Sequence, residues 1–407
     1  MKYSISSFVA NILLAALILS MLLFQTAYMN YKLAIILLLF VINLFKGEYR
    51  LSNFNVTIFG ILSIILILGV YSILSALLMG TLSYNEVLER VPFLLIHPIL
   101  FYVLLPNIMG DKIQNLCNIL IVGHFLMTII TLYNIYAVFT GLPPLMFLEG
   151  ETYVFDDNGM GVASGTTYQI LVTMPLFFVM GWSKKISKTL FLIGSVITIA
   201  YVIIAGSNAL VFIMMLCLFI PFIAKRVLGK ENVYDIHSKL LIIPLSIVLI
   251  MGVMELKKAD QIQILYSDFK EHFSNVDERY EQRKLFIAEW KKSPFFGEGY
   301  GKTYFTSAKG FSKQFESMYH LSLATTGLLG LSLLFLYLGI IVYNVYVRSI
   351  IEKNPYCLGL MLGLVACIIC NSTNPVLASF DRLLSIYLCI GCIADSSINN
   401  RIDYNEI

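Results

Sequence analysis

The segment DERYEQRKLFIAEWKKSPFFGEGYGK, residues 277–302, lies in the one long polar interval of a chain that is otherwise mostly apolar. This interval, residues 255–317, holds 21 of the 53 charged side chains of the sequence. Long hydrophobic runs flank it on both sides. Because the core of a lipid bilayer does not solvate ions, this contrast predicts that polar chemistry is gathered beside a membrane.

The composition indicates an integral membrane protein. Hydrophobic residues make up 58% of the 407 residues, charged residues make up 13%, and the mean hydropathy is +0.81. Soluble proteins carry about 25% charged residues. A helix of roughly 20 apolar residues crosses a bilayer and satisfies its own backbone hydrogen bonds there. We therefore predict an all-α, polytopic membrane protein with about 12 transmembrane helices and one large helical loop.

The expected transmembrane helices are the longest apolar runs of the sequence. They lie near residues 8–27, 31–45, 56–79, 91–105, 116–139, 166–181, 188–205, 208–224, 240–254, 319–347, 356–370 and 383–394. The chain is thereby divided into residues 1–254 with the first nine helices, the large loop 255–318, and residues 319–407 with the last three helices and a short tail. No small-residue cleavage site follows the first helix, so we expect it to remain as an anchor.

The distribution of positive charge predicts the orientation. Most Lys and Arg residues of the short connections lie on the same side as the two termini, whereas the opposite short connections carry only Lys32, Arg90 and Arg382. By the positive-inside rule both termini are cytoplasmic, and the large loop lies outside the cytoplasm. A second outward loop, residues 140–165, is acidic, and the two outward loops could face each other.

Two helices are expected in the large loop. Ile262, Leu265, Phe269 and Phe273 recur at helical spacing and predict an amphipathic helix that lies on the membrane surface. A second helix is expected from about Glu278 to Lys292, where the following Pro294 stops it.

On this second helix, Arg279 and Arg283 are one turn apart and project from the same face. Arginine stays charged at any relevant pH and binds phosphate oxygens in a bidentate manner. The pair therefore suits a diphosphate leaving group. An alternative is a solvated helix face that forms ion pairs with Glu278, Glu281 or Glu289.

Candidate residues for substrate contact and proton transfer follow this helix. The run Gly297, Gly299 and Gly301 lacks the flanking strand and helix of a dinucleotide motif, and it predicts a tight backbone turn close to substrate. Glu316 lies where the loop meets the next span, so partial desolvation would raise the pKa of its carboxyl and suit it as a general base for a sugar hydroxyl. His320 is a second candidate for this role, and both residues have the alternative role of interfacial anchors.

Other polar signals are interpreted as structural. The C-x-x-C pairs at residues 367–370 and 389–392 fall in apolar helices, where thiols act as small hydrophobic groups, so no metal site is expected. His97 and His124 are interpreted as hydrogen-bonding residues between helices. The centres of the expected spans carry no Asp, Glu, Lys or Arg, which argues against an ion-coupled transporter.

The order and spacing of several residues resemble the signature region of the O-antigen polymerase and O-antigen ligase superfamily. That pattern is an arginine, a helix, a proline followed by G-x-G, and a catalytic-loop residue eleven positions before a glycine. Its counterparts here are Arg279, Pro294, the run from Gly297 to Gly299, Glu316, and Gly327. The family is also similar in having about twelve spans and one large periplasmic loop.

The resemblance implies a glycosyltransferase of the bacterial inner membrane. Its substrates would be undecaprenyl-diphosphate-linked oligosaccharides, with a chain-length regulator protein as a possible partner, and no cofactor, metal ion or nucleic acid would be required. Arg279, Arg283 and Glu316 would be catalytic. The residues expected to contact substrate are Tyr319, His320, Gly297, Gly299 and Asn208.

Two departures from the family pattern favour a polymerase of surface polysaccharide over a ligase that transfers glycan to lipid A-core. Ligases of the family carry histidine where this chain has Glu316, and the family often has Ser-Arg where this chain has Ser207 and Asn208. The alternatives that stay open are the ligase and, from another class, a transporter of lipid-linked oligosaccharides.

Overall fold

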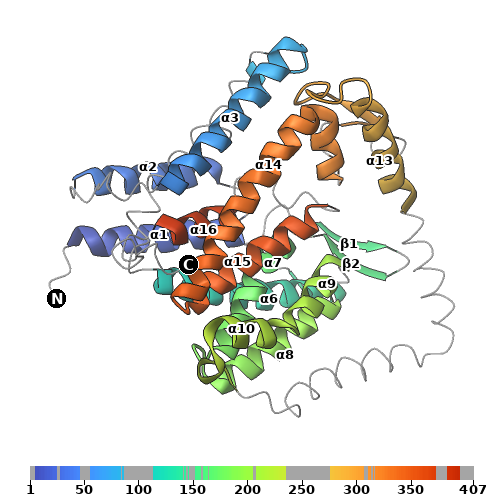
Figure 1. Ribbon diagram of the computed structural model, residues 1–407. Coiled ribbons are helices and arrows are strands. Elements are labelled where there is room, and N and C mark those ends of the chain that lie inside the picture. The colour runs from blue at the N-terminus through green and yellow to red at the C-terminus, as the bar shows by residue number, and fades with distance from the viewer. Residues whose placement is uncertain are drawn as a thin grey trace.

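The computed structural model describes residues 5–24, 28–45, 56–83, 85–86, 113–140, 142–143, 145, 152–156, 159–163, 165–204, 208–234, 276–306, 310–312, 315, 317–372 and 383–394. This part of the chain is mostly helical, as predicted (Figure 1). Its helices are α1 (Ile5–Leu23), α2 (Met29–Phe45), α3 (Val56–Leu78), α6 (Ile113–Thr140), α7 (Gly165–Trp182), α8 (Lys188–Ile204), α9 (Asn208–Cys217), α10 (Ile220–Leu228), η5 (Lys230–Asn232), α13 (Val276–Trp290), α14 (Met318–Ile351), α15 (Pro355–Cys370) and α16 (Leu384–Ala394).

Two short β-hairpins accompany the helices, and the sequence analysis did not predict them. Strand β1 (Thr152–Asp156) pairs antiparallel with β2 (Gly159–Ala163) in the acidic loop before α7. Strand β3 (Tyr304–Thr306) pairs antiparallel with β4 (Gly310–Ser312) between α13 and α14.

The expected count of about 12 membrane spans is not supported. Within the described residues, three helices are long and apolar enough to cross a membrane, namely α3, α6 and α14, or up to four if α9 and α10 form one broken span. The run expected as one helix over 208–224 is bent by 45° between these two helices. Helices α1, α2, α7, α8, α15 and α16 are apolar but shorter. The spans expected at 91–105 and 240–254, and the surface helix at 262–273, lie outside the described residues.

Helix α7 is the centre of the main hydrophobic core. Each residue from Gln169 to Gly181 is buried, and the helix contacts α1, α6, α8, α9, α10 and α15. It is apolar on all sides and carries no charged residue. A helix of this kind is stable only where other helices enclose it, which explains its central position.

Helix α15 packs closely on α7 along two glycines. A Cβ atom at Gly359 would lie 2.6 Å from Cδ1 of Leu176, and one at Gly363 would lie 2.5 Å from the carbonyl oxygen of Val172. Two small residues four positions apart let helix backbones approach each other without a groove-filling side chain. The G-x-x-x-G run at 359–363 therefore sets the distance between α7 and α15.

Polar side chains inside the bundle join neighbouring helices, as His124 shows. His124 of α6 is buried and lies 3.0 Å from the hydroxyl of Thr173 on α7 and 2.9 Å from that of Thr198 on α8. Its ring stacks on Phe177 at 5.2 Å. All seven cysteines are buried and free, and the described residues contain no cluster of three metal-ligating side chains. His97 lies outside the described residues.

We expect Gly363→Ala to destabilise the bundle, because the added methyl group meets a backbone oxygen that cannot rotate away. Overpacking costs about 1–3 kcal/mol, which exceeds the gain of about 1 kcal/mol in helix propensity. Thermal unfolding in detergent should show a lower midpoint. Gly339→Ala on α14 is the matched control, since a Cβ there has no neighbour within 4 Å. An unchanged midpoint for Gly363→Ala would contradict the packing argument.

Candidate functional site

Helix α14 is broken at Gly327, nine residues after it begins at Met318. Gly327 has φ 66° and ψ −169°, a backbone conformation that is open essentially only to glycine. The break divides α14 into a short segment before Gly327 and a longer segment that continues to Ile351. A break of this kind leaves backbone N–H and C=O groups without partners inside the helix.

The turn and glycine run after α13 supply those partners. Four backbone hydrogen bonds join α14 to this turn and glycine run. In α14, the N–H groups of Leu328 and Leu329 donate to the carbonyl oxygens of Pro294 (2.9 Å) and Phe295 (3.2 Å). In the glycine run, the N–H groups of Glu298 and Gly299 donate to the carbonyl oxygens of Ala324 (2.8 Å) and Thr325 (3.0 Å). The predicted tight turn is confirmed, because Gly297, Gly299 and Gly301 all have positive φ. A side chain at Gly297 would collide with the backbone of Thr325 and Gly327, so the run serves close backbone approach.

The C-terminal end of α3 holds the same junction from the other side. The hydroxyl of Tyr71 donates to the carbonyl oxygens of Phe296 (2.6 Å) and Thr326 (3.1 Å), one on each side of the junction. The Thr81 hydroxyl donates to the carbonyl oxygen of Tyr300 at 2.7 Å. Helices α3 and α14 and the glycine run are thereby fixed as one unit.

A small aromatic core fixes α13 above this junction. Phe286 of α13 is buried against Tyr304 of β3 and Phe315, with ring centroids 5.3 and 5.1 Å apart in edge-to-face geometry. Leu321 and Ala324 of α14 complete the cluster. We call the described residues between 276 and 326, which these contacts hold together, the cap. Figure 1 shows α13 beside the N-terminal end of α14.

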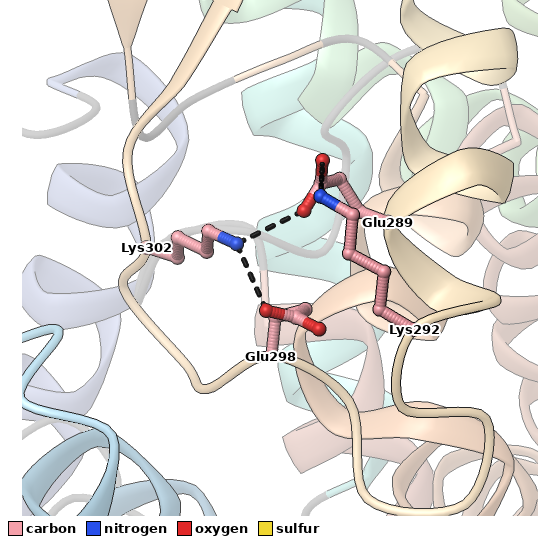
Figure 2. A network of polar contacts seen from close by, with 4 residues as sticks. All are labelled: Glu289, Lys292, Glu298 and Lys302. Carbon is pink, nitrogen blue, oxygen red and sulfur yellow. Dashed lines mark hydrogen bonds and ion pairs between the residues drawn. The ribbon is translucent and has the colours of Figure 1, made fainter.

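Four charged side chains tie the end of α13 to the glycine run (Figure 2). The ammonium group of Lys302 lies 3.0 Å from the carboxylates of both Glu289 and Glu298, and that of Lys292 lies 2.6 Å from Glu289. Burial opposes ionisation of Glu289, but hydrogen bonds from Lys292 and Lys302 outweigh it and lower the pKa of the carboxyl. Burial likewise opposes the charge of Lys302, but both glutamates raise its pKa. Glu289 and Lys302 are therefore both charged at neutral pH.

The cap places His320 within the electrostatic influence of Arg283. Arg283 is exposed on α13, and its positive charge acts on the imidazole of His320 at the start of α14. His320 is half-buried, and its Nδ1 atom lies 3.2 Å from the hydroxyl of Ser317. The backbone N–H of Ser317 in turn donates to the side-chain oxygen of the buried Gln282, one residue before Arg283. This arrangement presents a cation and a titratable ring on one surface of the cap.

The structure bears on the expected arginine pair only in part. Helix α13 covers Val276–Trp290, which agrees with the predicted helix and places Arg279 and Arg283 one turn apart. The side chain of Arg279 lies outside the described part of the structure. No carboxylate among the described residues forms an ion pair with Arg283, and Glu289 pairs with lysines instead. The solvated ion-pair alternative is thus not seen for Arg283 in this part of the chain.

The other predicted site residues have mixed outcomes. Glu316 lies outside the described residues, as does the side chain of Asn208, the first residue of α9. The hydroxyl of Tyr319 donates to the carbonyl oxygen of Ile368 on α15 at 2.6 Å, so it ties α14 to α15. Its contact with substrate stays a prediction, as does that of Gly297 and Gly299.

Sequence reasoning missed Tyr71 and the cluster around Lys302. Tyr71 lies within an apolar run more than 200 residues from its partners, as the separations of 225 and 255 residues show, and nothing local marks its role. A weak indication of the ion pair between Lys302 and Glu298 was present in the sequence, because the two residues are four positions apart. The second partner of Lys302, Glu289, is reached only through the turn between them.

No protein-family model matches the sequence, and a comparison with curated proteins finds no match. The resemblance to O-antigen polymerases and ligases therefore rests on the motif residues alone.

The pKa shifts predict how the cap responds to acid. Because the pKa of Glu289 is lowered in the folded chain, its ion pairs stabilise the cap above the ordinary value of 4.5, and this contribution is lost as the pH falls through the lowered pKa. Lys302→Met removes one cause of the lowering, so the acid transition should move to higher pH. Fluorescence of Trp290 in a Trp182→Phe background measures it, since Trp290 Nε1 donates to the carbonyl oxygen of Pro294.

Lys291→Met is the control for this experiment. Lys291 is exposed and neighbours Lys292, but it is not part of the charged cluster. An acid transition that shifts equally in both variants would show a general charge effect and would refute the role of Lys302.

Proposed function

We propose that this chain is a glycosyltransferase that joins lipid-linked repeat units of a bacterial surface polysaccharide outside the cytoplasm. A hydroxyl oxygen of the acceptor repeat attacks the anomeric carbon of the donor glycan. The new glycosidic C–O bond forms as the bond from that carbon to the lipid diphosphate breaks. Glu316 acts as general base and accepts the proton of the attacking hydroxyl, and the diphosphate leaves with both electrons of the broken bond.

In this proposal Arg279 and Arg283 bind the diphosphate as its negative charge develops. Their guanidinium groups stabilise the transition state more than the ground state, because the bridging oxygen gains charge only as the bond breaks. In this proposal His320, on which the charge of Arg283 acts, contacts the same substrate or shares the proton with Glu316. The reaction as written consumes no nucleotide and involves no redox step.

The observation that carries the proposal is the exposed Arg283, whose charge acts on His320, on a cap that is anchored to a membrane-length helix. An exposed arginine without a carboxylate partner among the described residues retains its capacity to bind an anion. Its position at the N-terminal end of α14 suits an anion that is itself tethered to a lipid. The apolar composition of the chain and the motif order of Arg279, Pro294, the glycine run and Glu316 add support.

The proposal separates from its alternatives by the phenotype of a gene deletion. In a host that makes lipopolysaccharide, loss of a polymerase should leave single repeats attached, seen as one short band on a gel. Loss of a ligase should leave none attached and accumulate lipid-linked polymer. Loss of a transporter should hold lipid-linked units on the cytoplasmic face. Long chains of normal abundance in the deletion strain would contradict the polymerase, the ligase and the transporter alike.

For Arg283 we expect Arg283→Ala to lower polymer formation by about 10- to 100-fold, since a hydrogen bond to a charged group contributes about 1.5–3 kcal/mol. Arg283→Lys should give a level of polymer between those of the unchanged chain and Arg283→Ala, because lysine retains the charge but not the bidentate geometry. Lys284→Ala is the matched control, as Lys284 is an exposed cation on the next position of α13. Chain-length distributions at equal protein level provide the measurement, and equal losses in the 283 and 284 alanine variants would count against the site.

We also expect Glu316→Gln to abolish long chains at normal expression, because the amide retains the shape of the side chain but cannot accept the proton. Chain-length distributions at equal protein level provide the measurement. Normal chain lengths in Glu316→Gln, together with loss of long chains in His320→Gln, would assign the base role to His320 instead.

A further inference from the structure

The turn between α13 and the glycine run exposes two large aromatic side chains. Phe295 is 68% exposed and Phe296 is 59% exposed, although both belong to a rigid junction. Their backbones are held by the N–H of Leu329 and the hydroxyl of Tyr71. Two adjacent phenylalanines fixed in an exposed position would be costly in water, because removing an aromatic ring from water is favourable.

The exposed rings continue an apolar surface of membrane-length helices. Leu328 and Leu329 of α14 are exposed where they bond the turn, and Leu78 and Met79 are exposed at the end of α3, beside Gly299. Both α3 and α14 are long and apolar enough to cross a membrane. A surface that is apolar and exposed along such a helix is the surface that faces lipid.

The length of α14 places the turn at a definite depth. Residues 328–347 contain no Asp, Glu, Lys or Arg, and Arg348 and Glu352 form an ion pair directly after them. A helix of 20 residues rises about 30 Å, which is the thickness of the hydrocarbon core. Tyr343 and Tyr346 are exposed at the Arg348 end, where interfacial aromatic residues are expected. The break at Gly327 therefore lies at the opposite boundary of the hydrocarbon.

We propose that the turn of Phe295 and Phe296 is immersed in lipid at this boundary and sets the depth of the cap in the membrane. Because the carbonyl oxygens of Pro294 and Phe295 accept from the N–H groups of Leu328 and Leu329, the turn lies where the uncharged stretch of α14 begins. The charged cluster of Lys292, Glu298 and Lys302 flanks the turn and stays in the headgroup layer. The occupant of this surface is the bilayer itself, not a protein partner or a second copy of the chain.

The test uses the full chain in vesicles of phosphatidylethanolamine and phosphatidylglycerol, without any glycan substrate. A nitroxide is attached at Phe296→Cys, and the native cysteines give little background because all seven are buried. Collision rates with oxygen, which concentrates in lipid, and with a water-soluble nickel chelate are compared by power saturation. Lys292→Cys, four residues earlier and exposed, is the aqueous reference, and the exposed Leu336→Cys of α14 is the lipid reference.

We expect the oxygen-to-nickel ratio at residue 296 to exceed that at residue 292 by several-fold and to lie below that at residue 336. A ratio equal to that at residue 292 would overturn the inference, because the turn would then face water. Low collision with both reagents and an immobile nitroxide would also overturn it, since a protein contact would cover the site. Phe295→Cys repeats the measurement if the 296 variant does not fold. Because no polymerisation is measured, failure of the proposed function leaves the result unaffected.

Discussion

The exchange of backbone hydrogen bonds at Gly327 is the constraint on which the cap depends. A helix that breaks near the boundary of a membrane must satisfy its freed N–H and C=O groups within the protein, because lipid offers them no partner. Here the turn and glycine run after α13 do so, and Tyr71 adds a hydroxyl to the same junction. The cap is therefore fixed to α3 and α14 by the same bonds that make the break possible.

An aromatic cluster and a set of ion pairs attach α13 to this junction. The aromatic cluster of Phe286, Tyr304 and Phe315 excludes water between α13 and α14, and the ion pairs of Lys302 close the loop that joins them. Each alone is weak at a protein surface, but together they hold one face of α13 inward. As a result Arg283 is directed outward near His320, and a cation is presented without a carboxylate partner among the described residues.

Local patterns in the sequence predicted most of the individual elements. Apolar runs predicted helices that the structure confirms at α1, α2, α3, α6, α7, α8, α15 and α16, and the helix predicted from about Glu278, with Pro294 as its stop, corresponds to α13. The glycine run was predicted as a tight turn. The bend between α9 and α10, the break at Gly327 and the two hairpins were missed, because a continuous apolar run does not reveal where a helix changes direction.

The sequence by itself determined the helical and membrane-like character of the chain, the position of the polar interval and the pairing of Arg279 with Arg283 on one helix face. These follow from composition and from spacing within a single element. Only the tertiary structure decided that Pro294, Phe295 and the glycine run complete the broken α14, that Tyr71 bonds this junction from α3, and that the charge of Arg283 acts on His320. These contacts join residues far apart in the chain, and their geometry depends on how the helices pack.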